Sequence, residues 1–104
     1  MAELALLYST FADREEAERV ARVVLDERLA ACVNILAPCT SIYRWQGEIA
    51  QGDEVPALFK TRPTLERRLR ERIAELHRYD LPVIESWPVA AGDAVVEWID
   101  GETL

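Results

Sequence analysis

Three residues of this chain have side chains that commonly bind copper or zinc: His77, Cys32 and Cys39. A neutral imidazole and a thiolate are ligands that both metals accept. There is one histidine and no CxxC pair, so a closed four-ligand zinc site within one chain is not expected. Structural roles are the alternative. His77 could cap a helix or lie at an interface, and Cys32 could be a small apolar residue of a strand.

The spacing of the two cysteines bears on their redox state. If residues 32–39 run extended, the two sulfurs lie about 23 Å apart, and their odd separation places them on opposite faces of the strand. A Cys32–Cys39 disulfide then fails on distance, unless Pro38 folds the strand back. Free thiols are typical of a reducing compartment, so we expect a cytoplasmic protein. Cys39, next to Pro38, is expected to be the more exposed thiol and the better ligand for a soft metal.

Other chemistry finds little support in the sequence. Asp53 and Glu54 could offer oxygen ligands to a hard cation, or form a solvated turn. Ser9 and His77 lack the GxSxG context of a hydrolase nucleophile, and no glycine-rich loop is present to hold phosphate. We therefore expect neither an enzyme nor an organic cofactor.

Apolar spacing predicts the elements that must position these residues. Short apolar or β-branched runs indicate strands, and apolar residues recurring every three or four positions indicate helices. The predicted strands are 3–11, 31–46, 48–61 and 82–89, and the predicted helices are 13–29, one that begins at Pro63 and a short one after Gly92.

Four local signals refine this order of elements. Asp13 followed by Glu16 is typical of a helix start. Gly47 predicts a hairpin turn, and Gly52-Asp53 gives a second turn signal within the return strand. Pro38 should bulge or break the strand 31–46, and Pro56 should lie at an edge or beside a bulge.

The order βαββαβ predicts an α+β, ferredoxin-like split βαβ sandwich. Its antiparallel sheet carries the helices on one face, a short C-terminal helix follows, and residues 1–104 form one domain. The face without helices needs a cover. Tyr43 and Trp45 alternate along the hairpin and are poor candidates for contact with water, so we expect an oligomer.

Charge and hydropathy exclude other partners. The chain carries 12 basic and 19 acidic residues, a net charge of −7. This balance argues against binding of nucleic acid or of anionic lipid. No apolar run is long enough to cross a bilayer, and the N-terminus has no secretory signal, so no membrane association is expected.

Four runs resemble one protein family: RLAACVN (28–34), TSIYRWQG (40–47), KT (60–61) and HRYDLP (77–82). In order and spacing they are similar to the CutA divalent-cation tolerance proteins, over residues 7–99. The resemblance implies a ferredoxin-like subunit in a tight homotrimer, similar in architecture to the trimeric PII signalling proteins. It also implies a response to divalent metal ions, copper above all.

The same resemblance bears on the site residues. Some bacterial members carry a cysteine where this chain has Ser9 and paired histidines where it has Leu76 and His77, so one of three such ligands is kept. Lys60, Tyr79 and Trp45 match the family's runs. They could bind an anionic or aromatic small ligand near a subunit boundary, or could be structural, with the two rings packing between subunits and Lys60 pairing with a carboxylate.

Two functions therefore stand as hypotheses. The first is a homotrimeric divalent-cation tolerance protein that binds copper or other divalent ions weakly, with His77, Cys39 and Cys32 as candidate ligands. The second is a PII-like trimeric sensing module that binds a small ligand in the clefts between subunits.

Overall fold

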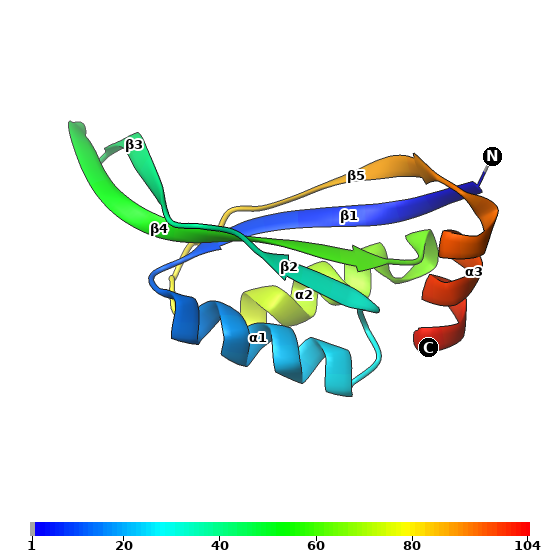
Figure 1. The fold of residues 1–104 in the computed structure, drawn as a ribbon. Helices are drawn as coiled ribbons and strands as arrows, with labels where there is room; N and C mark the ends of the chain where they lie inside the picture. Colours follow the sequence, from blue (N-terminus) through cyan, green and yellow to red (C-terminus); the bar gives the residue numbers. More distant parts are fainter. Residues whose placement is uncertain (1) are drawn as a thin grey trace.

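A computed structural model describes residues 2–104 of the chain (Figure 1). Its elements follow the predicted order, with the strand 31–46 divided in two. They are β1 (Ala2–Phe11), α1 (Arg14–Asp26), β2 (Cys32–Ile35), β3 (Cys39–Trp45), β4 (Glu48–Thr61), the 3₁₀ turn η1 (Pro63–Leu65), α2 (Glu66–Leu76), β5 (Ile84–Ala91) and α3 (Asp93–Glu102).

The strands form one antiparallel sheet in the order β2–β4–β1–β5, and β3 pairs with the far end of β4. Helices α1 and α2 cover one face of this sheet, and α3 lies at one end (Figure 1). The predicted α+β class, with an antiparallel sheet and helices on one face, is confirmed.

Side chains alternate in direction along the two central strands, β1 and β4, so that one face of the sheet forms the core and the other face is open. Leu7 and Phe11 of β1 and Phe59 of β4 are fully buried, where they pack in one cluster with Val20 of α1 and Ile73 of α2. The residues between them point to the opposite face, because successive side chains of a strand alternate. That open face carries partly exposed residues: Leu6, Tyr8, Thr10, Leu58 and Lys60.

A one-residue bulge separates β2 from β3. Ile35 pairs with Ala57, whereas Cys39 pairs with Glu54, so four steps on one strand match three on the other. Pro56 lies opposite this interruption, and its carbonyl accepts a hydrogen bond from the Leu36 N–H at 2.9 Å. Since the N and O atoms of one strand residue point to the same side, the N–H that Pro56 lacks would face the bulge. The predictions for Pro38 and Pro56 are confirmed.

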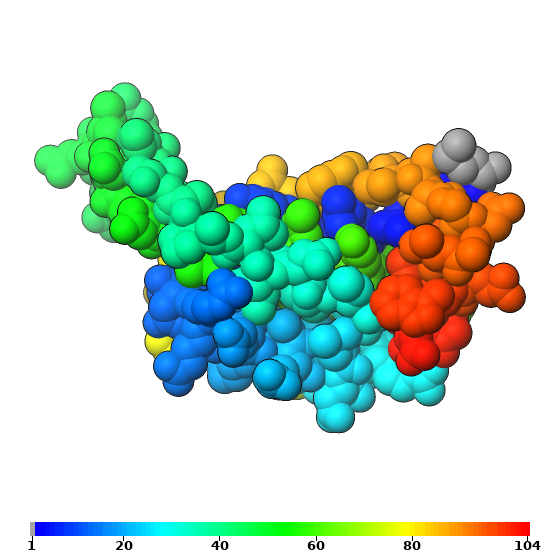
Figure 2. All heavy atoms as spheres, viewed as in Figure 1, coloured from blue at the N-terminus to red at the C-terminus, as the bar shows by residue number. Residues whose placement is uncertain are grey.

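Beyond the bulge, β3 and the first half of β4 form a hairpin that curves away from the helices (Figures 1 and 2). Its turn residues Gln46 and Gly47 have φ angles of 50° and 84°. Two consecutive positive φ angles are typical of the type I′ turn that suits a twisted hairpin. The second turn predicted at Gly52-Asp53 is wrong, because both residues pair with β3 inside β4.

Helix α1 begins as predicted but ends earlier. The Asp13 side chain accepts a hydrogen bond from the Glu16 N–H at 2.8 Å. The helix ends at Asp26 rather than near 29, because Arg28 adopts a left-handed conformation with φ of 59°. The Arg28 guanidinium donates to the carbonyl of Gly101 at 3.0 Å, which ties this end of α1 to α3.

The Glu16 side chain joins α1 to the end of α2 from a buried position. Only 1% of it is exposed, although it is a carboxylate. It accepts hydrogen bonds from Arg19 at 2.6 and 3.2 Å and forms an ion pair with Arg78 at 3.2 Å. Arg19 also donates to the carbonyl of Leu76, the last residue of α2, at 2.6 Å.

Candidate functional site

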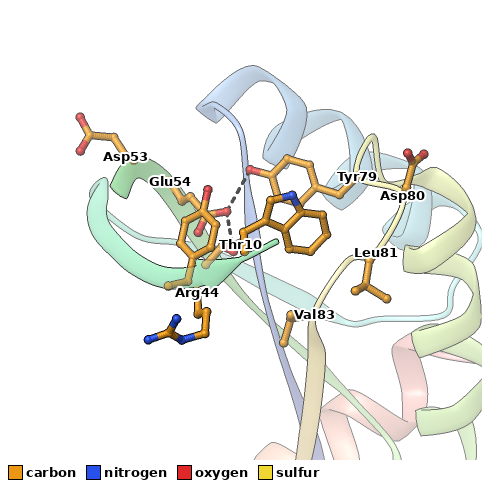
Figure 3. A pocket seen from close by; sticks show the side chains of 11 residues that line it. Thr10, Arg44, Asp53, Glu54, Tyr79, Asp80, Leu81 and Val83 are labelled. Carbon is orange, nitrogen blue, oxygen red and sulfur yellow. Dashed lines mark hydrogen bonds between the residues drawn. The ribbon is translucent and has the colours of Figure 1, made fainter. Parts of the chain in front are cut away.

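An open cavity of about 610 Å³ lies where the hairpin meets the body of the subunit (Figure 3). Its wall combines the hairpin, the end of β1 and the segment that follows α2. The lining residues are Thr10, Tyr43, Arg44, Trp45, Gly52, Asp53, Glu54, Tyr79, Asp80, Leu81 and Val83.

Glu54 is the polar centre of this pocket. Its carboxylate accepts hydrogen bonds from Thr10 Oγ1 at 3.0 Å and from the Tyr79 hydroxyl at 2.9 Å (Figure 3). Burial acts to raise the pKa of Glu54, but the hydrogen bonds from Ser41, Tyr79 and Thr10 outweigh burial and hold that pKa below its usual value. The pocket therefore contains a negative charge at neutral pH.

Tyr79 contributes a neutral hydrogen-bond donor to the same pocket. Burial, followed by the hydrogen bond to Glu54, raises the pKa of Tyr79 to about 12. Its phenol therefore stays protonated at neutral pH and donates to the carboxylate. The aromatic ring remains partly exposed beside the cavity.

The register of the hairpin sorts the other lining residues by face. Side chains of directly paired residues share a face, and alternate residues along one strand do too. Cys39 pairs with Glu54, so Tyr43 and Trp45 lie on the same face as Glu54. Arg44 and Asp53 belong to the other face, and in Figure 3 both side chains point away from Glu54.

His77 anchors the segment after α2 that carries Tyr79 into the pocket. It follows the last residue of α2 and is 8% exposed. Its Nδ1 accepts a hydrogen bond from the Tyr79 N–H at 3.2 Å, which makes Nε2–H the donor to the Thr10 carbonyl at 2.8 Å. The ring also stacks on Phe11, with centroids 4.5 Å apart. Both ring nitrogens are thus engaged within the subunit, and neither has a lone pair free for a metal ion.

The two cysteines are free thiols and partly exposed. Cys32 pairs with Lys60 and Cys39 with Glu54, six positions apart on β4, which corresponds to about 20 Å along the strand. The expectation of opposite faces is wrong, because the bulge adds one residue and restores the phase. Within residues 2–104, no three His, Cys, Asp or Glu side chains gather as a metal ion would require.

The second candidate set is divided by the fold. Tyr79 and Trp45 line the cavity, whereas Lys60 does not. Lys60 pairs with Leu6 and Cys32 near the far end of β4. Sequence reasoning missed Glu54 as the centre of the pocket. The available signal was its place in a long hairpin strand, two residues before Pro56, which the false turn at Gly52-Asp53 obscured.

The model of the family described as CutA1 divalent ion tolerance protein matches residues 5–102. The chain belongs to the CutA1 family. Among curated relatives, CutA of Thermus thermophilus is 40% identical over 99% of both chains, and CutA of Pyrococcus horikoshii is 42% identical over 96% of this chain and 98% of its own. Both are named divalent-cation tolerance proteins.

Solved CutA1 structures have the same fold. The crystal structure of CutA1 from Pyrococcus horikoshii superposes with a TM-score of 0.91 at 40% identity, over 96% of this chain and 98% of its own. CutA1 from Ehrlichia chaffeensis superposes with a TM-score of 0.93 at 33% identity, over 100% of this chain and 98% of its own. The predicted CutA-like fold is therefore confirmed.

Compartment names differ among the CutA relatives. The Arabidopsis thaliana relative is called chloroplastic, and the solved Archaeoglobus fulgidus protein is called periplasmic. In the part of the chain described here, no helix has the length and apolar character needed to span a bilayer. A cytoplasmic location stays a prediction.

Proposed function

We propose that this protein is a homotrimer that binds divalent metal ions, copper among them, and acts in the cytoplasmic response to those ions. Family membership carries the proposal, because the family and its curated relatives are named for divalent-cation tolerance. The net charge of −7 per chain supports it, since excess negative charge attracts cations to a protein surface.

The hairpin supports assembly into a trimer. It projects from the subunit (Figure 2) and presents large apolar side chains on the face opposite the pocket, Ile49 at 72% exposed and Ile42 at 66%. The open sheet face adds Trp87 at 44%. Exposed apolar side chains on a projecting hairpin and on an uncovered sheet face are typical of an interface between copies.

Sedimentation equilibrium tests the assembly. We expect a mass three times the 11.8 kDa of one chain, unchanged on tenfold dilution. Replacing both Ile42 and Ile49 by serine, on the face of the hairpin opposite the pocket, should shift the mass toward the single chain, because it removes exposed apolar area. The matched variant Trp98→Ser, on α3, should remain at the higher mass. A wild-type mass near 11.8 kDa would overturn the trimer.

For metal binding we propose the partly exposed thiols as ligands for soft metal ions at two separate positions of the subunit, Cys39 first and Cys32 second. Cys39 is paired with Glu54, so a carboxylate lies beside it on the same face. His77 remains a candidate only if its ring leaves Thr10 and Tyr79, because both nitrogens are used. A threefold axis could also bring together copies of a residue that one chain carries once.

Isothermal titration with Cu²⁺, and with Zn²⁺ to avoid thiol oxidation, tests these ligands. We expect Cys39→Ser to weaken Zn²⁺ binding about tenfold, because a thiolate is a far better ligand than a hydroxyl. Cys32→Ser should have a smaller effect, and His77→Gln should leave binding unchanged. Loss of binding in His77→Gln alone would assign the metal to the imidazole instead.

A second function is supported by the cavity of about 610 Å³, a volume within the range of small-molecule sites. Under this alternative, the protein is a trimeric sensing module that resembles PII proteins and binds a small ligand near a subunit boundary. A ligand of the native trimer raises its melting temperature, so a thermal-shift screen of nucleotides, anions and cations examines it broadly.

A further inference from the structure

The charges around the cavity determine whether it can bind an anion or a cation. The one carboxylate at its centre, Glu54, is held by Thr10 and Tyr79. The only basic residue among the lining side chains is Arg44, which lies on the opposite face of the hairpin. Lys60, the residue that favoured an anionic ligand, is about 20 Å away along β4. The interior of the pocket is therefore negative.

The walls of the pocket are aromatic. Tyr43 and Trp45 share the face of Glu54, and Tyr79 reaches the same carboxylate from the segment after α2. The face of an aromatic ring attracts a cation, and it attracts most strongly a cation that has shed its water. Alkylated ammonium groups are weakly hydrated and apolar at their surface, whereas small divalent metal ions hold their water tightly.

We propose that this cavity is a binding site for a small organic cation, an alkylated ammonium group that sits against Tyr43, Trp45 and Tyr79 with Glu54 as its counter-ion. The proposal rests on the small-ligand function and names the ligand class of that pocket. The protonation states agree with it, because Glu54 is a carboxylate and Tyr79 a neutral donor at neutral pH. Leu81 and Val83 supply further apolar wall for the alkyl groups.

Tetramethylammonium chloride is a suitable probe, and nuclear magnetic resonance gives the readout. The chain has three tryptophans, so the ¹H–¹⁵N spectrum contains three indole signals. We expect a saturable shift of the Trp45 signal and little change at Trp98, which is similarly exposed on α3. The neutral isostere tert-butanol and equal concentrations of sodium chloride should not reproduce the shift.

Two neighbouring carboxylates provide a matched pair of variants. Glu54→Gln keeps the shape and can still accept hydrogen bonds from Thr10 and Tyr79, but removes the charge. It should weaken tetramethylammonium binding about tenfold. Asp53→Asn removes the adjacent charge on the other face and should leave the affinity within about twofold. Tyr43→Leu should also weaken binding, because it removes one aromatic ring, and the shift of the Trp45 indole signal gives the readout.

Three results would overturn the proposal: an equal shift with tert-butanol, equal effects of Glu54→Gln and Asp53→Asn, or no saturable shift at Trp45. A parallel Zn²⁺ titration of Tyr43→Leu separates this site from the metal function, because loss of an aromatic wall should not affect a metal bound by thiols. Zn²⁺ binding without tetramethylammonium binding refutes the cation pocket alone. The reverse result refutes the metal function alone.

Discussion

Replacing Glu16 by alanine should lower the free energy of unfolding by about 3 kcal/mol. The carboxylate is 1% exposed and accepts two hydrogen bonds from Arg19. Its loss removes these bonds and the ion pair with Arg78, and leaves a gap between α1 and the end of α2. This loss of stability lies at the lower end of the range for broken buried ion pairs. Both arginines are partly exposed, so water can hydrate them once the carboxylate is gone.

Urea denaturation of the assembled protein at one fixed concentration measures this effect. Glu18→Ala provides the control, because Glu18 forms an exposed ion pair with Arg14 on the same helix at 3.5 Å. That variant should lose no more than about 0.5 kcal/mol. Equal losses in the two variants would mean that burial of Glu16 contributes nothing to stability.

The same carboxylate predicts a pH dependence. Hydrogen bonding from Arg19 is the main cause that lowers the pKa of Glu16 from its ordinary value of 4.5. A group whose pKa is depressed in the folded state stabilises that state above its ordinary pKa, and this stabilisation is lost as pH falls through the folded value. Wild type should therefore lose stability below about pH 4.5 more steeply than Glu16→Gln does. Parallel curves would contradict this.

Replacing His77 by alanine should also cost about 3 kcal/mol, through a different mechanism. The substitution leaves the Thr10 carbonyl and the Tyr79 N–H without their partner and removes the ring stacked on Phe11. The segment after α2 should then lose its anchor. Because that segment carries Tyr79, the bond from its hydroxyl to Glu54 should weaken as well.

Denaturation and metal titration together distinguish this structural role from a ligand role. Tyr79→Phe is the comparison variant, since it removes only the hydroxyl and should cost about 1 kcal/mol. If His77→Ala keeps wild-type stability yet loses Cu²⁺ binding, His77 is a metal ligand and the structural account is wrong.

Much of the fold could be predicted because its signals are local. The spacing of apolar residues along α1 and the run of strand-forming residues in β1 indicate directly which of their side chains are buried. Gly47 and Pro38 mark a turn and a break whose backbone geometry few other residues adopt or impose. Such features depend on neighbouring residues and need no knowledge of what packs against them.

The parts that could not be predicted depend on pairing between distant segments. Cys39 joins the face of Cys32 only because β4 meets a bulge, and Lys60 is far from Tyr79 only because of the β1–β4 register. In the sequence, Glu16 marks a helix start and Glu54 looks like part of a solvated turn or a ligand of a hard cation, and neither interpretation points to its distant partner. Their partners Arg78 and Tyr79 follow α2, more than twenty positions later.

The bulge between β2 and β3 also determines how this region tolerates changes in length. Residues 36–38 connect two ladders that differ by one residue in register. The two-residue turn at Gln46 and Gly47 fixes the pairing of β3 with β4, so adding or deleting a residue at 36–38 would leave Tyr43 and Trp45 on their present face. Such a change would alter the bulge alone, and deleting one residue would give β2 and β3 one continuous ladder with β4. This linker can therefore vary in length without exchanging the two faces of the hairpin.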